Sequence, residues 1–328
     1  MKKVEISGVG IHSGVESSIT VRATDSGGIV FIRNGVRIPA LYKNVANAML
    51  RNTAIGIPPN EVTTIEHFMA AMFVCGIANA EIEIDGPEMP ILDGAAAELI
   101  GRLKGLVPAV QSGLLVVKNE VVARRGELDK KLPWWIKAAN FICGRRRDGY
   151  VKLSPSDGKR LEIFARLIYK EPVIGDQKYA FVFDYGDFGA SAADFEKTIA
   201  KARTFGTVGE WEWLKRRGMG RGANERNVIA LGTISELERL QRLGLGCGVK
   251  AENITSAGKN DVVALTRLYY PDEFVRHKII DIVGDLYMSG FRVAGKIDSF
   301  KGSHALNNLA LRKLFSNAEN YDIIPFEI

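Results

Sequence analysis

The sequence predicts an α+β protein with two related domains, and three observations support this prediction. Segments with strand-like alternation occur in groups, and helical segments follow each group instead of alternating with the strands one for one. Two distant segments, Glu66-His67 and Arg276-His277, each open an apolar helix that ends in glycine before another strand. The length of 328 residues is sufficient for two ordinary domains, each with its own core.

The first domain is predicted at residues 1–110 and begins with β-structure. Its expected elements, in order, are paired strands within 4–22 and 29–41, a helix over 65–74, a strand over 80–84 and a helix over 93–103. Thr63 and Thr64 are expected to cap the first helix, because a hydroxyl can accept a hydrogen bond from the first free N–H groups. Gly76 is expected to end that helix.

The second domain is predicted at residues 111–328 and also begins with strands. Its expected elements are strands over 114–117, within 150–168 and over 227–231, helices over 193–201, 235–243 and from 272, a strand over 291–297, and a final helix near 304. Residues 127–149 interrupt the strand rhythm and are expected to form an insertion or an extended hairpin. The helix from 272 carries most of the candidate chemistry.

Composition is typical of a soluble globular protein, with 46% hydrophobic and 25% charged residues. The sequence has no run of about 18 apolar residues and no signal peptide at its start, so we expect a cytoplasmic protein. Three widely spaced cysteines predict neither a disulfide framework nor a cysteine zinc site. A net charge of +6 suits an anionic substrate or a peripheral contact with the inner membrane, and no nucleic-acid partner is expected.

The helix from 272 has a polar edge formed by His277, Asp281 and Asp285. Positions i, i+4 and i+8 project from nearly the same face, and apolar residues cover the rest of the helix, so this edge is expected to be buried. His277 and Asp281 can supply two metal ligands, with His67 as the best third candidate. The alternative from spacing alone is an ordinary hydrogen-bonded pair.

Two further groups extend the metal hypothesis into a hydrolytic site. Glu66, beside His67, can accept the proton of a water that a metal makes more acidic. His304 lies between a strand and the final helix, where it can donate a proton or steady an oxyanion, especially if Asp285 orients it. Thr204 is another possible oxyanion donor.

Six segments follow one another along the chain: Gly8-Val-Gly-Ile-His-Ser-Gly14, Thr64-Ile-Glu-His67, Pro90-Ile-Leu-Asp-Gly94, Ala202-Arg-Thr-Phe-Gly206, Asp272 through Asp285, and His304-Ala-Leu-Asn-Asn308. Together and in this order they resemble the UDP-3-O-acyl-N-acetylglucosamine deacetylase family, the zinc amidases of lipid A synthesis. The resemblance implies two α+β domains, each a sheet layered with helices, with the active site at the domain interface. It also implies hydrolysis of the N-acetyl amide of UDP-3-O-acyl-N-acetylglucosamine.

The resemblance further implies a role for each matching residue. Zn²⁺ is expected on His67, His277 and Asp281. The remaining roles are Glu66 as general base, His304 as its protonated partner supported by Asp285, Thr204 and Lys278 at the oxyanion or carbonyl, Lys301 at the diphosphate, and Phe205 at the sugar. Trp211 falls in the segment that lines the acyl-chain passage.

The chain departs from the family pattern at three places, and the third, a pair of tryptophans, leaves the lipid substrate open. Gly222-Ala223-Asn224 replaces a usual Gly-Gly-Ser, Gly302-Ser303 precedes His304, and Trp211 and Trp213 occupy positions where smaller side chains are common. One alternative is therefore a zinc amidase acting on a different acylated nucleotide sugar. A second alternative is a non-catalytic regulator that binds the nucleotide lipid, although every expected catalytic residue is present. The sequence predicts no oligomeric state.

Overall fold

The computed structural model describes residues 3–46, 52–106, 113–130, 148–171, 173–216, 218–224, 226–233, 235–236, 263–264 and 267–326. The expected boundary near residue 110, most of the insertion expected over 127–149 and most of the helix expected over 235–243 lie outside these residues. Within the described ranges, no helix has the length and apolar character needed to cross a membrane.

The first domain contains a five-stranded sheet and two helices. Its strands are β1 (Lys3–Val9), β2 (Glu16–Ala23), β3 (Ile29–Arg33), β4 (Val36–Pro39) and β7 (Ala80–Ile84), and its helices are α1 (Glu66–Val74) and α2 (Ala97–Leu103). The strand order is β1-β2-β7-β3-β4, and β3 and β7 are its parallel neighbours. Alternate residues of β2 and β7 are buried, as expected for a sheet covered on one face.

A seven-stranded sheet forms the core of the second domain. Its strands are β8 (Leu114–Val117), β9 (Val121–Arg124), β10 (Tyr150–Ser154), β11 (Arg160–Ile168), β12 (Asp176–Asp184), β16 (Arg292–Phe300) and β17 (Tyr321–Ile324). The accompanying helices are α3 (Arg125–Lys130), α5 (Phe188–Thr198), α8 (Glu273–Tyr287) and α9 (His304–Leu314). The described chain also has short 3-10 helices, of which η1 (Tyr42–Asn44) follows β4 of the first sheet, and η2 (Tyr185–Asp187) and η4 (Ala318–Asn320) adjoin strands of the second sheet.

The two sheets share one topology, which confirms the prediction of two related α+β domains. The order β9-β10-β16-β11-β12 repeats β1-β2-β7-β3-β4 strand for strand. The central pair is parallel in both sheets, and the other neighbours along each path are antiparallel. In both domains a helix, α1 or α8, leads directly into the central strand.

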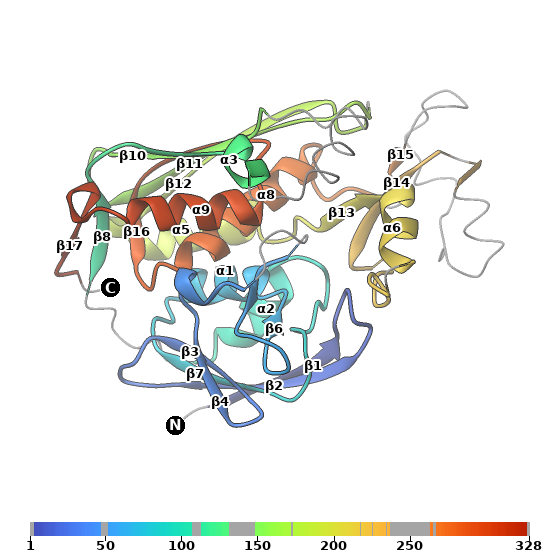
Figure 1. Ribbon diagram of the computed structural model, residues 1–328, viewed down its shortest axis with the longest axis horizontal. Coiled ribbons are helices and arrows are strands. Elements are labelled where there is room, and N and C mark those ends of the chain that lie inside the picture. The colour runs from blue at the N-terminus through green and yellow to red at the C-terminus, as the bar shows by residue number, and fades with distance from the viewer. Residues whose placement is uncertain are drawn as a thin grey trace.

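Helices α1 and α8 lie against each other between the two sheets (Figure 1). Every residue of α1 is buried, because one side faces the first sheet and the other faces the second domain. The two helices approach so closely that an ideal Cβ on Gly284 would lie 1.9 Å from the carbonyl oxygen of Glu66. Glycine at this position therefore sets the distance between the domains' central helices.

A smaller unit projects beside the layered core (Figure 1). It contains β13 (Thr204–Thr207), β14 (Val228–Gly232) and β15 (Val263–Ala264) in one sheet, with α6 (Val208–Lys215) beside them. A separate hairpin in the first domain pairs β5 (Ala54–Ile55) with β6 (Val62–Thr63).

The sequence expectations about the N-terminal ends of α1 and α5 were wrong. Thr63 belongs to β6, and Thr64 adopts a left-handed conformation with φ 60°, so neither side chain caps α1. Helix α5 begins at Phe188 instead of near residue 193, because the carboxylate of Asp187 accepts a hydrogen bond from the N–H of Ala190. Helix α6 was not expected, although Thr207 and Glu210 form a capping box at its start.

Candidate metal centre and active site

Three potential metal ligands from the two central helices converge at the domain interface. His67 lies in the first turn of α1, whereas His277 and Asp281 lie one turn apart on α8. Oδ1 of Asp281 is 3.4 Å from Nε2 of His277 and 3.6 Å from Nε2 of His67. All three residues are buried, and one donor atom from each lies within 4.8 Å of the others. Together they could hold a metal ion.

The chemistry of this cluster fits a tetrahedral metal. Ligand bonds of about 2.0–2.1 Å place tetrahedral donor atoms about 3.3–3.4 Å apart, close to the two distances measured at Asp281. Oδ1 of Asp281 accepts no hydrogen bond from any described residue, although it is buried. A buried carboxylate oxygen without a hydrogen atom directed at it is costly, and a bound cation removes that cost.

The orientation of His277 also favours a ligand role. Its Nδ1 lies 3.0 Å from the carbonyl oxygen of Ala202, so Nδ1 donates its hydrogen and Nε2 presents a lone pair to the cluster. Burial lowers the pKa of His277 to about 3, so the ring is neutral near pH 7. Ala202 directly precedes the Arg203-Thr204-Phe205 segment, which therefore adjoins the metal centre.

Glu66 lies next to the cluster with one carboxylate oxygen held and the other directed inward. The N–H of Thr53 donates to Oε2 at 2.9 Å, and Oε1 is 3.8 Å from Nε2 of His304. Burial raises the pKa of Glu66, which brings a carboxylate nearer to the range useful for proton transfer at neutral pH. Glu66, a potential base, and His304, a potential acid, thus face each other beside the cluster.

Asp285 contacts His304, which is the pair that the resemblance implies. Nδ1 of His304 lies 2.8 Å from Oδ2 of Asp285, and the side-chain amide of Asn307 donates to the same oxygen at 2.8 Å. Burial alone would lower the pKa of His304, but the carboxylates of Asp285, Glu66 and Asp281 raise it to about 10. The imidazole is therefore protonated at neutral pH in this charge arrangement.

Lys278 and Phe205 border the same space. Nζ of Lys278 lies 2.7 Å from Oδ2 of Asp281 and 5.6 Å from the centre of the Phe205 ring. The Phe205 ring is in turn 6.2 Å from that of His277. Thr204 begins β13, and its N–H donates to the carbonyl of Gly94 at 2.9 Å. The Ala202-to-Phe205 segment thus passes the site and continues into the smaller unit.

Lys301 and Trp211 are not in contact with the metal cluster through any described interaction. Nζ of Lys301 pairs with Asp148 at 2.9 Å and lies 5.0 Å from the centre of the Phe300 ring. The indole N–H of Trp211 donates to the carbonyl of Gly220 at 3.2 Å within the smaller unit. Their predicted contacts with substrate remain predictions.

Several functional contacts were not identified from the sequence. Thr53 contacts both Glu66 and Asp285, yet it lies in no motif singled out above. Glu88 is buried where its carboxylate accepts hydrogen bonds from the N–H groups of His12 and Ser13 and from the hydroxyl of Thr64. The signal that the sequence did offer was the glycine-rich segment Gly8-to-Gly14, whose glycines let its backbone approach the Glu88 side chain closely. Gly10, for example, has no space for a Cβ beside Glu88.

Strain accompanies this arrangement at Thr64. A β-branched residue with φ 60° is rare, because its side chain crowds the backbone in the left-handed region. The hydroxyl of Thr64 donates to Glu88 at 2.7 Å and accepts from the amide of Asn52 at 3.0 Å. These bonds hold the strained turn that directs Glu66 and His67 into the site.

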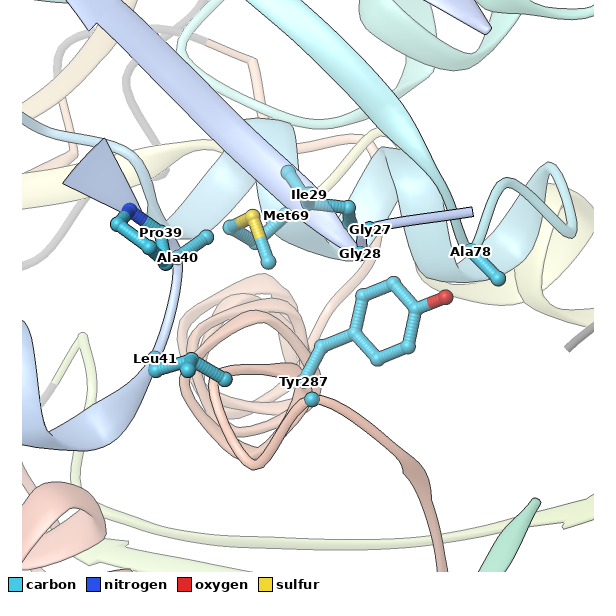
Figure 2. Close-up of a pocket in the computed structure, with 10 residues that line it drawn as sticks. Gly27, Gly28, Ile29, Pro39, Ala40, Leu41, Met69, Ala78 and Tyr287 are labelled. Carbon is cyan, nitrogen blue, oxygen red and sulfur yellow. The ribbon is translucent and has the colours of Figure 1, made fainter. Parts of the chain in front are cut away.

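A separate cavity of about 50 Å³ lies among β3, β4, α1 and the end of α8 (Figure 2). Its lining is apolar or glycine except for Tyr287, and the Tyr287 hydroxyl donates to the carbonyl of Ile77 at 2.9 Å. Burial raises the pKa of that phenol, so it stays protonated. The cavity therefore offers packing space without acid–base or metal chemistry.

Comparisons with known proteins place this geometry in a family. The family model described as LpxC, UDP-3-O-acyl N-acetylglycosamine deacetylase, matches residues 1–233 and 230–316. A Myxococcus xanthus (strain DK1622) protein named UDP-3-O-acyl-N-acetylglucosamine deacetylase is 33% identical, with 99% of this chain and 88% of that protein covered. Proteins of the same name from Aliarcobacter butzleri (strain RM4018) and Histophilus somni (strain 129Pt) are 32% and 30% identical, with 99% of this chain and 92% of each protein covered. The chain belongs to the UDP-3-O-acyl N-acetylglycosamine deacetylase family.

Proposed function

We propose that this protein is a zinc-dependent deacetylase of lipid A biosynthesis. Its substrate is UDP-3-O-acyl-N-acetylglucosamine, and its products are acetate and the free amine. The observation that carries the proposal is the buried His67, His277 and Asp281 cluster, with Glu66 and His304 facing each other beside it. Family membership supports the substrate, because the matched relatives carry the name of this deacetylase.

The donor set supports zinc as the metal. Two imidazole nitrogens and one carboxylate oxygen match the ligand types of catalytic zinc sites, which use three protein ligands and keep a fourth position open. When bound, zinc supplies a Lewis acid that polarises the amide carbonyl and makes a water molecule more acidic. The carbonyl of Ala202 fixes the His277 ring, and Lys278 holds Oδ2 of Asp281, so that Oδ1 is left for the metal.

Proton transfer is assigned to the two facing groups. Glu66 accepts a proton from the attacking water, whose oxygen forms the new bond to the acetyl carbon. As the carbon–nitrogen bond breaks, His304 donates a proton to the leaving amine. Its protonated state in the described charge arrangement suits this task, and Asp285 keeps the ring in place.

The surrounding residues are proposed to bind substrate. Lys278 and Thr204 stabilise the developing oxyanion, and Phe205 contacts the sugar. Lys301 contacts the diphosphate, which requires its ammonium to leave Asp148, an ion pair that is partly exposed. Trp211 borders the acyl chain.

The proposal is tested by measuring bound zinc and amine release from the UDP-acyl-sugar for wild type, Glu66→Ala and His277→Ala. Glu66→Ala should retain zinc and lose most turnover, because Glu66 is not among the three ligands. His277→Ala should lose both zinc and turnover. Full turnover by metal-free protein, or by Glu66→Ala, would contradict the mechanism.

A zinc amidase with a different acylated nucleotide sugar as substrate is the second candidate. The observation that favours it is the presence of two indoles on α6, with Trp213 48% exposed. Turnover of UDP-sugars with a series of acyl-chain lengths distinguishes the candidates, since a blocked passage predicts preference for short chains. A cytoplasmic location and peripheral membrane contact remain predictions, and cell fractionation tests both.

A further inference from the structure

Thr53 occupies a buried position between the two domains. It precedes β5, and the pairing of β5 with β6 brings it beside the start of α1, where the N–H of Ile65 donates to its carbonyl at 3.3 Å. Its side chain is only 2% exposed. The β5–β6 hairpin therefore fixes the backbone of Thr53 against the turn that leads into Glu66.

Thr53 bonds to two carboxylates that belong to different domains. Its N–H donates to Oε2 of Glu66 at 2.9 Å, and its hydroxyl donates to Oδ1 of Asp285 at 2.6 Å. Glu66 opens α1, whereas Asp285 lies near the end of α8. A single residue thus links the proposed base to the carboxylate that holds the proposed acid.

These bonds determine which oxygens remain for the reaction. With Oε2 of Glu66 engaged by Thr53, Oε1 is the oxygen that faces Nε2 of His304. Asp285 accepts from Thr53 on one oxygen and from His304 and Asn307 on the other. A carboxylate with hydrogen bonds on both oxygens cannot rotate freely, so its bond to His304 also fixes the orientation of the imidazole ring.

We propose that Thr53 is a positioning residue that sets the alignment of Glu66 with His304 by holding Glu66 and Asp285 at once. This inference rests on the proposed function, because it concerns the two groups assigned to proton transfer. Without the hydroxyl, Oδ1 of Asp285 loses its donor and the carboxylate can turn with the His304 ring. The backbone N–H would still hold Glu66, so the defect would appear on the His304 side.

Two substitutions separate the hydroxyl from the shape of the side chain. Thr53→Val keeps the branched shape and removes the hydroxyl, whereas Thr53→Ser keeps the hydroxyl. Thr63→Val is the matched control, because it makes the same change in the same hairpin, where the hydroxyl bonds only to the Pro87 carbonyl among described residues. The measurements are kcat, KM, bound zinc and thermal stability.

Thr53→Val should lower kcat by about 10- to 100-fold, the range typical for loss of a group that orients a catalytic residue. KM and bound zinc should stay near wild type, because Thr53 contacts none of the three ligands through a described bond. Thr53→Ser should recover most of kcat, and Thr63→Val should leave it unchanged. Equal losses in Thr53→Val and Thr63→Val would overturn the proposal.

A double-mutant cycle distinguishes positioning from a general structural defect. In an Asp285→Ala background, Thr53→Val should cost less than about twofold in kcat, since the hydroxyl no longer has its target. The same large loss in both backgrounds contradicts the inference.

A readout without substrate separates this inference from the proposed function. In metal-free protein, the ring ¹⁵N signals of His304 should shift in Thr53→Val and stay in place in Thr63→Val. Unchanged His304 signals in Thr53→Val refute positioning. If wild type does not turn over the UDP-acyl-sugar but the His304 signals still shift in Thr53→Val, only the proposed substrate is refuted.

Discussion

Gly284 lies where α8 crosses α1, and alanine at this position is expected to separate the two helices. An added Cβ would lie 1.9 Å from the carbonyl oxygen of Glu66 and 3.2 Å from the backbone nitrogen of Ala70. Because both contacts are backbone, no side chain can rotate away to make space. Real Cβ atoms essentially never approach closer than 3.0 Å, so the helices must shift by about 1.1 Å.

This shift should affect activity far more than stability. Overpacking costs about 1–3 kcal/mol, and replacing a helical glycine by alanine returns about 1 kcal/mol, so the free energy of unfolding should fall by about 0–2 kcal/mol. A displacement of about 1 Å between Glu66 on α1 and His304, which Asp285 on α8 holds, should lower kcat by about 10²-fold. The distance from His67 Nε2 to Asp281 Oδ1 should also exceed its present 3.6 Å, which would weaken binding of the proposed zinc ion.

The assay compares kcat, zinc retained after equilibrium dialysis, and urea unfolding for wild type, Gly284→Ala and Gly101→Ala. Gly101 is the matched control, because it lies in helix α2 and a Cβ added there would meet no neighbouring atom within 4 Å. Gly101→Ala should be slightly stabilised with unchanged turnover. Wild-type kcat and zinc affinity in Gly284→Ala would refute the claim that helix spacing sets the site.

Three further predictions concern ionisable groups that are buried or, for Cys75, partly buried. In metal-free protein, Asp285→Asn should lower the pKa of His304, measured by NMR titration of the ring. Because that pKa is raised from 6.5 to about 10, the stability from the protonated ring is full below about pH 6.5 and is lost as pH rises towards 10. Burial raises the pKa of Cys75 to about 12, so with the other two cysteines replaced by serine its alkylation at pH 8 should require unfolding. Glu273→Ala should cost about 3–5 kcal/mol in urea unfolding, because it leaves Arg203 buried without its carboxylate at 2.9 Å.

Each of these predictions has an outcome that contradicts it. An unchanged His304 titration in Asp285→Asn would mean that other charges hold the imidazolium. Rapid alkylation of folded protein would show that Cys75 is accessible as thiolate. For the buried pair, Asp176→Ala breaks the exposed pair with Arg166 and serves as control, so equal losses in the two variants would contradict the role of burial.

Local periodicity predicted the part of the site that one helix carries. The spacing of His277, Asp281 and Asp285 indicated one buried face, and all three side chains are buried on α8. The adjacent Glu66 made His67 the best third candidate before any resemblance, but no local pattern reports a contact between two domains, so the full ligand set came from the family resemblance. The sequence sign of the duplicated topology was the pair of Glu-His and Arg-His helix starts, each followed by a glycine at the helix end and then a strand.

Other features depend on tertiary contacts that leave little trace in the sequence. Thr53 precedes a strand of two residues, too short for periodicity to reveal, and its partners lie 13 and 232 positions away. Gly284 did offer a signal, because glycine inside a helix is unfavourable unless another backbone approaches closely. Thr64 shows the opposite error, since its residue type favours a helix cap and the bond to Glu88 instead holds it in a strained turn.

The crossing of α1 and α8 makes the candidate metal centre a late product of folding. His67 and Asp281 are separated by 214 positions, so closing the chain between them costs configurational entropy that only the completed domain interface offsets. During synthesis the first domain emerges with one ligand and no partner, and it cannot form a three-ligand site before the C-terminal helices are available. Stable metal uptake therefore reports that both halves of the duplicated fold have docked.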